Sequence, residues 1–298
     1  MTLFTVVVPT CNRAALLREA LDSVLTQTFT DFEVIVVDDG STDETPSVVA
    51  GYGDRVRSYR QANRGPGAAR NLGAAHAKGD YLAFLDSDDL WFPWTLGTYH
   101  RLLEQHDHPA FLAGKPLRFR GEGGPPATAP APSRAVTFPD YLASGDEWRW
   151  WGASSFVIRG DVFGLAAGFR EDFVVAEDSD LALRLGTAPG FVQVLSPATF
   201  AYREHGGNLT KDFSKTLGAT WLSVQAERAG RYPGGTSRAR ERRQILTRHA
   251  RPVALGCLRR GMRREGWGLY RAMFRWHVSL GRWKFLAGFP LAAAGGLP

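Results

Sequence analysis

The chain has 298 residues, 44% of them hydrophobic and 22% charged, which is enough apolar material for one large domain with an appendage or for two modest domains. Its two cysteines, Cys11 and Cys257, lie far apart, so we expect no disulfide framework and a reducing, cytoplasmic compartment. The longest uncharged stretch, 285–298, is too short to span a bilayer, and residues 1–8 resemble a first strand rather than a secretion signal.

The net charge of +6 is unevenly distributed along the chain. Residues 236–298 hold 13 arginines and one lysine against two glutamates, a net charge of +12, so the remainder carries −6. Such a basic segment indicates an anionic partner or surface, or an acidic part of the same chain on which it packs.

Apolar strands and amphipathic helices alternate through the first ninety residues. The pattern predicts, in order, a strand at 5–9, a helix at 16–25, a strand at 32–37, a helix at 42–50, a strand at 56–60, a helix at 68–77 and a strand at 81–85. This alternation is typical of an α/β fold in which a mostly parallel, Rossmann-like sheet carries helices on both faces. We expect Thr10 or Asn12 to cap the first helix.

The pattern changes in the second part of the chain. It predicts a Pro/Ala/Gly-rich loop at 121–133, a helix at 177–185, a strand at 191–195 and a basic, mainly helical segment after residue 232. We therefore expect a main domain at 1–210 and a basic helical extension at 211–298.

Polar clusters follow three of the predicted strands: Thr10–Arg13, Asp38–Asp39 and Asp86–Asp89. The carboxyl ends of parallel strands share one edge of a sheet, and ligands bind there. Asp86 and Asp88 alternate at a strand end, so both carboxylates could face a divalent cation that bridges the phosphates of a ligand. The alternative interpretation of this cluster is a solvated acidic turn.

Three further features have two interpretations each. A carboxylate at Asp38–Asp39 could accept a hydrogen bond from a nucleobase or a ribose, or could form an Asx turn. Arg70 follows a glycine-rich turn and could point at a nucleotide or lie on the surface, although the polar residues 60–63 argue against a dinucleotide fingerprint. Glu177 and Asp178 could be catalytic, or could be acidic residues favoured at the N-terminus of a helix.

Four segments, in this order and spacing, resemble the inverting family 2 glycosyltransferases, which have a GT-A fold. They are VVVPTCNR (6–13), EVIVVDDGSTDET (33–45), NRGPGAARNLG (63–73) and GDYLAFLDSDD (79–89). The resemblance resumes at 168–171 and 176–181 and extends to 202–208. It implies a metal-dependent enzyme that moves a sugar from a nucleotide-diphosphate sugar to an acceptor hydroxyl, in polysaccharide, cell-envelope glycan or glycoconjugate biosynthesis.

The resemblance also implies roles for individual residues. The residues that would bind the donor are Pro9, Thr10, Asn12, Arg13, Asp38, Asp39, Arg70, Asp86 and Ser87. Asp88 would bind Mg²⁺ or Mn²⁺ on the diphosphate, with His205 as a further ligand. Asp178 would deprotonate the acceptor, and Glu177 would orient the acceptor or the metal shell. A base on one face of the sugar and a metal-held leaving group on the other imply one displacement with inversion.

In this family the nucleotide-binding half would be 1–92 and the acceptor half 93–210. Arg170 stands where the family often has an acidic or small residue, and the loop near 121–134 is particular to this chain. Both departures fall in the acceptor half. The acceptor is therefore expected only as a class, a glycan, lipid-linked or other hydroxyl compound.

Two apolar stripes run along a helical wheel of residues 264–285, with arginines on one flank between them. One stripe holds Trp267, Tyr270, Phe274, Val278 and Phe285, and the other holds Leu269, Met273, Trp276, Leu280 and Trp283. This pattern suits a helix at an anionic membrane surface, at the inner face of the membrane, through 236–298. Packing on the acidic part of the chain or on a second subunit is the alternative, and no nucleic-acid partner is expected.

Two other classes of function remain open from the sequence. A nucleotidyltransferase or another nucleotide-dependent enzyme of similar fold would need a strand directly before Gly65. A non-enzymatic binding module that acts through the basic segment would leave Asp39, Asp88 and Asp178 without a role.

Overall fold

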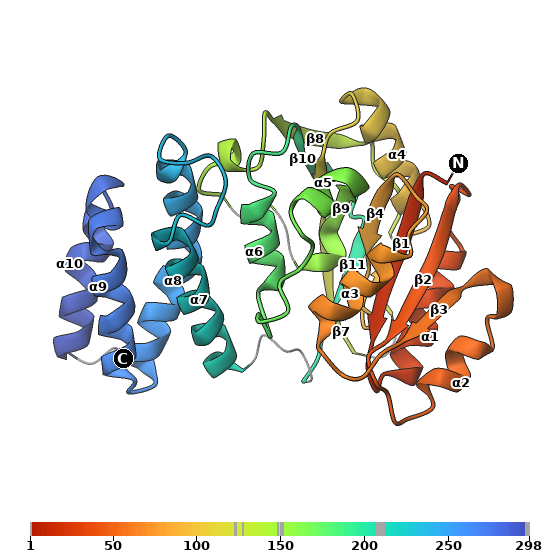
Figure 1. Cartoon of the computed structure of the whole chain (residues 1–298), viewed down its shortest axis with the longest axis horizontal. Coiled ribbons are helices and arrows are strands. Elements are labelled where there is room, and N and C mark those ends of the chain that lie inside the picture. The colour runs from red at the N-terminus through yellow and green to blue at the C-terminus, as the bar shows by residue number, and fades with distance from the viewer. Residues whose placement is uncertain are drawn as a thin grey trace. The chain divides into compact units, whose positions relative to one another are not determined.

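The computed structural model describes residues 2–121, 124–126, 128–147, 149, 152–206 and 212–295 (Figure 1). The chain divides into two compact units, one of residues 1–141 and 149–211 and one of residues 142–148 and 212–298. The boundary expected at residue 210 falls within 207–211, outside the described residues, so the domain division stays a prediction.

A mostly parallel sheet forms the core of the first unit, and eight of the described strands belong to it in the order β3-β2-β1-β4-β9-β6-β10-β8. The first four strands of the chain are parallel to one another and confirm the predicted alternation: β1 (Phe4–Thr10), β2 (Phe32–Asp38), β3 (Arg57–Arg60) and β4 (Tyr81–Phe84). Thr10 pairs with Asp38, so the polar residues after β1 and β2 leave the sheet at the same edge.

The other strands of this sheet introduce antiparallel pairs that the sequence pattern did not predict. They are β6 (Phe111–Ala113), β8 (Arg134–Phe138), β9 (Phe156–Arg159) and β10 (Phe191–Ser196). β9 runs antiparallel to β4 and β6, and β8 runs antiparallel to β10. A smaller sheet, also absent from the prediction, has the order β5-β11-β7 and consists of β5 (Leu90–Trp91), β7 (Pro116–Arg120) and β11 (Phe200–Glu204).

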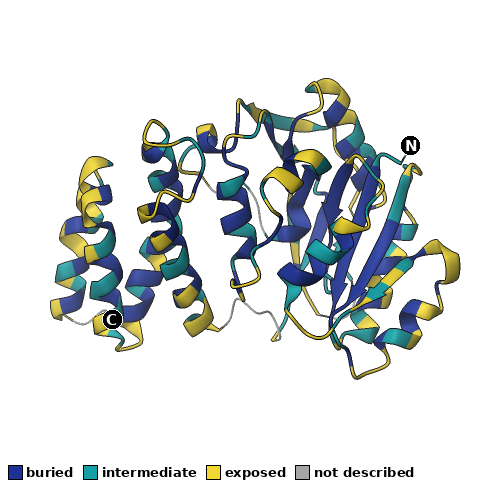
Figure 2. Cartoon of the chain, viewed as in Figure 1, coloured by how far each residue is buried: buried dark blue, intermediate teal, exposed yellow. Residues whose placement is uncertain are grey.

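Helices cover both faces of the large sheet, as predicted, because successive side chains of a strand point to opposite faces. Val6 and Val8 of β1 belong to the same buried cluster as Leu17 and Leu21 of α1, whereas Ile35 and Val37 of β2 cluster with Ala69 of α3 on the other face (Figure 2). The helices of this unit are α1 (Ala14–Leu25), α2 (Thr45–Ala50), α3 (Pro66–Ala75), α4 (Thr95–Gln105), α5 (Gly160–Leu165) and α6 (Glu177–Arg184).

The cap expected for α1 is wrong. Neither Thr10 nor Asn12 caps the helix, because the Asn12 side chain accepts a hydrogen bond from the Thr42 backbone N–H at 2.7 Å. The Asp43 carboxylate instead accepts from the backbone N–H of Ala14 at 3.2 Å. Asp43, in the loop after β2, thus accepts the hydrogen bond at the start of α1 that was expected of the residues just before the helix.

Gly73 lets α3 approach the sheet closely. A Cβ at this position would lie 2.4 Å from Cγ1 of Val7 and 3.3 Å from Cγ2 of Val37. We expect Gly73→Ala to lower the free energy of unfolding by about 1–3 kcal/mol, the usual cost of overpacking a core. Gly97→Ala in α4 is the matched control, since its Cβ would meet nothing closer than 3.9 Å and should be neutral or stabilising by about 0.5–1 kcal/mol. Urea unfolding measures both; equal effects would contradict the close contact.

The second unit is helical, as expected for the basic segment. Its helices are α7 (Phe213–Arg228), α8 (Ala239–Arg259), α9 (Arg263–Ser279) and α10 (Trp283–Gly295). A buried ion pair joins α8 to α7, with Nε of Arg242 2.6 Å from a carboxylate oxygen of Glu227. In the part of the chain that the structure describes, none of the helices combines the length and apolar content needed to cross a membrane.

The helical wheel drawn over 264–285 does not correspond to one helix. The chain turns at Gly281, whose φ is 65°, so α9 and α10 are separate. α10 folds back on α9 and covers part of the first stripe: the Tyr270 ring stacks on Phe289 with 4.7 Å between centroids. The second stripe is partly core, because Leu269, Met273 and Trp276 are buried.

Candidate active site

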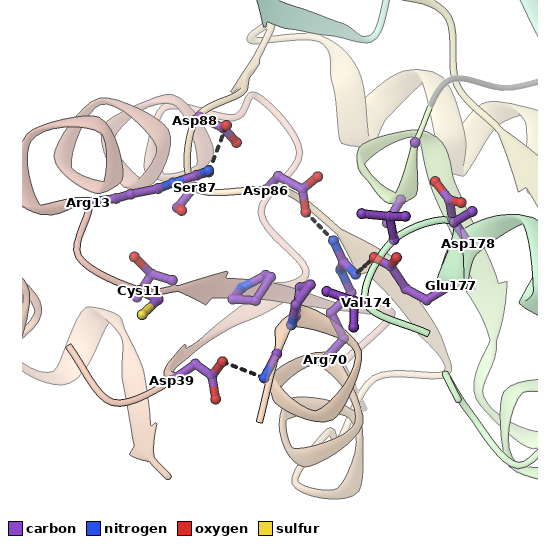
Figure 3. A pocket seen from close by; sticks show the side chains of 18 of the residues that line it. Cys11, Arg13, Asp39, Arg70, Asp86, Ser87, Asp88, Val174, Glu177 and Asp178 are labelled. Carbon is purple, nitrogen blue, oxygen red and sulfur yellow. Dashed lines mark hydrogen bonds and ion pairs between the residues drawn. The ribbon is translucent and has the colours of Figure 1, made fainter. Parts of the chain in front are cut away.

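One cleft of about 440 Å³ lies at the edge of the sheet where β1 and β4 end, beside the start of α6 (Figure 3). Ten of the residues singled out from the sequence line it: Pro9, Thr10, Arg13, Asp39, Arg70, Asp86, Ser87, Asp88, Glu177 and Asp178. They come from five separate stretches of the sequence. The parallel topology therefore gathers the polar clusters at one place, as the sequence indicated.

Three of the singled-out residues do not line this cleft. Asn12 holds the loop that starts at Thr42, as described above. Asp38 is buried and accepts from the backbone N–H of Ser41 at 2.8 Å, so it stabilises the turn after β2. His205 does not line the cleft itself, but its Nε2 atom lies 2.8 Å from Oδ2 of Asp88, which does. The donor-binding roles of Asn12 and Asp38 stay predictions without a contact to the cleft.

Asp39 fixes the glycine-rich turn that begins α3. Its Oδ1 accepts from the backbone N–H of Arg64 at 2.9 Å and from the Gln61 side chain at 2.8 Å, and its Oδ2 accepts from the N–H of Gly65 at 2.8 Å. Gly65 has a φ of 90°, which an L-residue rarely adopts. The carboxylate thus sets the shape of this wall of the cleft, and these three bonds leave one lone pair of Oδ2.

Arg70 links the two acidic motifs. It is 3% exposed, and its Nη2 lies 2.5 Å from Oδ1 of Asp86 while its Nη1 lies 2.7 Å from Oε1 of Glu177. The ring of Phe169 lies under the guanidinium at 5.1 Å. Burial opposes the charge of this arginine, but the two carboxylates outweigh it and raise its pKa above the ordinary value. Arg70 is therefore already paired with two carboxylates, and its contact with a nucleotide stays a prediction.

Asp178 lies in the first turn of α6, next to Glu177. The turn is fixed by Ala176, which has a φ of 60°, and by a 2.6 Å hydrogen bond from the backbone N–H of Ser179 to Oδ1 of Asp178. Burial, followed by the charge of Glu177, raises the pKa of Asp178 to about 7, and the positive charge of Arg70 opposes this rise. A carboxyl group with this pKa can accept a proton at neutral pH.

Asp88 lies at the other side of the cleft from Asp178, with Asp86 between them in Figure 3. Oδ2 of Asp88 lies 2.7 Å from Nη1 of Arg13 and 2.8 Å from Nε2 of His205. Carboxylate and imidazole are common ligands of divalent cations, and Asp88 also stands where an anionic ligand would meet Arg13.

Asp89, which the sequence analysis did not single out, ties this loop to its neighbours. It is 2% exposed and accepts hydrogen bonds from Oγ of Ser154 at 2.6 Å and from the backbone N–H of Arg203 at 3.1 Å. Burial, with the nearby charges of Asp88 and Asp86, raises its pKa well above the ordinary value. Its position as the third acid of the 86–89 cluster was the available signal.

Several cleft residues carried no chemical signal in the sequence. Those missed are Cys11, Asn63, Gly65, Pro66, Gly152, Ala153, Val174, Val175, Ala176 and Tyr202. Val174 is 55% exposed at the mouth of the cleft. Most contribute backbone or apolar surface, which a search for charged and nucleophilic residues does not find.

The sheet and its acidic edge have the architecture of the GT-A fold. Residues 5–145 match the profile of glycosyl transferase family 2. An uncharacterised glycosyltransferase of Rickettsia typhi is 42% identical over 91 residues, which cover 30% of this chain and 29% of that protein. EpsJ of Bacillus subtilis, an uncharacterised glycosyltransferase, is 31% identical over 222 residues, 70% of this chain and 63% of that protein. The chain thus spans under two thirds of the length of these relatives.

Solved structures share the fold. TarS 1–349 of S. aureus in complex with UDP-GlcNAc superposes with a TM-score of 0.67 and 21% identity, over 92% of this chain and 80% of that chain. The mannosyltransferase PcManGT of Pyrobaculum calidifontis, in complex with GDP-Man and Mn²⁺, gives a TM-score of 0.55 and 18% identity, over 99% and 88%. At these identities the likeness shows the fold alone.

Proposed function

We propose that the protein is an inverting, metal-dependent glycosyltransferase that moves a sugar from a nucleotide-diphosphate sugar to an acceptor hydroxyl. The observation that supports this most is that Asp39, Asp88 and Asp178, from three distant stretches of chain, line one cleft. The relatives named as glycosyltransferases and the donor-bound solved structures of the same fold agree with it.

The donor would lie along the edge of the sheet. Its nucleoside would contact Pro9, Thr10 and the remaining lone pair of Asp39, and its diphosphate would approach Arg13 and Asp88. The guanidinium of Arg13 can neutralise part of the charge that gathers on the diphosphate as it leaves. The sugar would then face Asp178 across the cleft.

Asp178 would take the proton of the acceptor hydroxyl as its oxygen bonds to the anomeric carbon. One bond forms and the bond to the diphosphate breaks on the opposite face, so the anomeric configuration inverts. A hydroxyl is a poor nucleophile, and a base with a pKa near the working pH gives the largest benefit. Glu177, which is held by its ion pair with Arg70, would orient the acceptor or the metal shell.

Asp88 and His205 fit a divalent cation. The donor set is a carboxylate and an imidazole 2.8 Å apart, and Mg²⁺ or Mn²⁺ on a nucleotide takes one or two protein ligands and completes its shell with phosphate and water. Among the described residues no group of three or more His, Cys, Asp or Glu is arranged to hold a metal. When bound, such a cation would stabilise negative charge on the departing diphosphate.

The alternatives left open by the sequence have less support. β3 ends at Arg60, five residues before Gly65, so the glycine turn is not fed directly by a strand as a dinucleotide site requires. A non-enzymatic binding module that acts through the basic segment would not account for the acidic residues that line one cleft. The acceptor is proposed only as a glycan, lipid-linked or other hydroxyl compound, used in polysaccharide, cell-envelope or glycoconjugate synthesis.

A thermal-shift panel of UDP-, GDP- and dTDP-sugars, each with and without Mn²⁺, tests the function. A donor at 100 times its Kd should raise the free energy of unfolding by about 2.7 kcal/mol. We expect one nucleotide class to stabilise the protein, more strongly with Mn²⁺, and Asp88→Ala to remove the metal-dependent part.

Asp54→Ala, in the exposed short helix η1 (Gly53–Arg55), is the control and should respond like the parent protein. If no donor shifts the transition with either metal condition, the proposed function is wrong.

A further inference from the structure

Helices α9 and α10 of the second unit carry many exposed residues (Figure 2), and several of these have large apolar side chains. Phe274 and Val278 of α9 are 44% and 39% exposed, and Trp283 and Leu291 of α10 are 62% and 72% exposed. Four large apolar residues are thus exposed on two helices that pack against each other, more than the scattered single residues that are normal on a protein surface.

The exposed side of α9 also carries arginines. At 100° per residue, Arg264, Arg271, Phe274, Arg275 and Val278 fall within an arc of about 100°. All three arginines are exposed, and among the described residues none of them forms an ion pair with a carboxylate. Their charge is therefore not balanced within the part of the chain that the structure describes, unlike that of Arg282, which lies 2.8 Å from Asp146.

The exposed side of α10 is almost wholly apolar. Its exposed residues are Trp283, Lys284, Ala287, Gly288, Leu291, Ala294 and Gly295. These positions recur at helical spacing, so they form one face, and Lys284 is its single charged member. A helix in water normally places polar residues on that side. The composition of this face indicates that something apolar covers it.

Aromatic packing holds the two helices in a fixed arrangement. Tyr270 contacts Phe285 and Phe289 of α10 and Phe274 of α9, at centroid distances of 5.9, 4.7 and 5.8 Å. Its hydroxyl donates to the backbone carbonyl of Leu286 at 2.9 Å. The exposed Phe274 ring thus adjoins the α9/α10 contact, and we call these two exposed sides together the α9–α10 face.

We propose that the α9–α10 face docks on the surface of an anionic lipid bilayer. Such a surface meets both needs of this face, since lipid phosphates attract the arginines and the acyl region accepts Trp283, Leu291 and Phe274. A second copy of the chain would oppose arginine to arginine. The only acidic residue on either helix is Glu265, which is half-buried. This inference goes beyond the proposed transferase activity and needs no nucleotide sugar.

Vesicle co-sedimentation of the full chain, without nucleotide, tests the proposal. We expect binding to vesicles of phosphatidylglycerol and phosphatidylcholine, little binding to phosphatidylcholine alone, and release by high salt. Each arginine near an anionic surface contributes about fivefold, so Arg264→Gln/Arg271→Gln/Arg275→Gln should weaken binding about 100-fold. Trp283→Ser/Leu291→Ser should weaken it too, and the residual binding of that variant should be more sensitive to salt.

The matched control removes three exposed arginines from the first unit, Arg18→Gln/Arg55→Gln/Arg101→Gln, and should bind like the parent. Circular dichroism establishes that each variant is folded. The proposal would be overturned if the parent protein did not bind anionic vesicles. It would also be overturned if the control variant lost as much binding as the Arg264→Gln/Arg271→Gln/Arg275→Gln variant. A dimer that dissociates in the Trp283→Ser/Leu291→Ser variant, or RNA that binds the face more tightly than the vesicles do, would contradict it as well.

Discussion

Asp178→Asn is expected to reduce the rate of sugar transfer about 10³-fold while leaving donor binding unchanged. Asparagine keeps the size of the side chain and can keep the hydrogen bond from Ser179, but it cannot take a proton from the acceptor. Because the acceptor is known only as a class, the rate is best measured as release of nucleoside diphosphate with water in the acceptor position. The thermal shift with the donor measures binding on the same sample.

Two comparisons make this result specific to the base. Asp54→Asn, on the exposed helix η1, should keep full activity. In the parent protein the rate should rise with pH and level off above about 7, because Asp178 is active only after it has lost its proton and its pKa is raised to about 7 by burial. Asp178→Asn should lack this rising limb. An unchanged rate in that variant would remove Asp178 from the role of base.

Arg70→Met should destabilise the first unit by about 3–5 kcal/mol, since it leaves Asp86 and Glu177 without their buried partner. The midpoint of urea unfolding measures this loss. Arg64→Met is the matched control, because Arg64 pairs with Glu171 at the surface, where an ion pair contributes less than about 1 kcal/mol. Equal effects of the two substitutions would contradict the structural role of Arg70.

A second variant separates this role from simple loss of packing. Arg70→Met/Glu177→Gln removes one of the two stranded carboxylates, so it should recover part of the lost stability. It should also change the pH profile of donor hydrolysis. Arg70→Met alone withdraws a positive charge that lowers the pKa of Asp178, so its rising limb should move to higher pH. The double variant also lacks the negative charge of Glu177, which raises the pKa of Asp178. The rising limb of its pH profile should therefore lie at lower pH than that of Arg70→Met alone.

The sequence was sufficient for the fold of residues 1–92 and for half of the residues that line the cleft. Strands β1, β2 and β4 each contain a run of consecutive apolar residues, which is the pattern of strands buried on both faces. Parallel pairing then places whatever follows each strand at one edge. That rule alone brings Asp39 and Asp88 together, without any knowledge of their contacts.

Residues 93–206 were harder to predict because their contacts are non-local. Asn71 exchanges two 2.7 Å hydrogen bonds with the backbone of Phe169, ninety-eight residues away, and this contact brings the segment before α6 to the cleft. Strand β5 has two residues, and β7 and β11 have five each, so these strands are too short to give a clear alternation of apolar and polar residues. The pairing of Arg70 with both acidic motifs likewise depends on the final packing, so the sequence could indicate the residue but not its partners.

The second unit shows where a helical wheel fails. The two stripes were drawn on one helix, and the positive φ of Gly281 divides it, so that Tyr270 of α9 packs against Phe285 and Phe289 of α10 instead of lying beside Phe285 on the same stripe. The arginines and Phe274 of α9 are still exposed when the two stripes are assigned to two helices. A membrane contact therefore stays a prediction with a smaller and better defined face.

A crystal structure of the protein with the nucleotide sugar selected by the thermal-shift panel, and with Mn²⁺, tests the central claim most directly. We expect the nucleoside to contact Asp39 and the diphosphate to lie beside Asp88 and His205. The anomeric carbon should lie between the diphosphate and Asp178. A nucleotide bound outside this cleft, or a diphosphate on the same side of the sugar as Asp178, would contradict it.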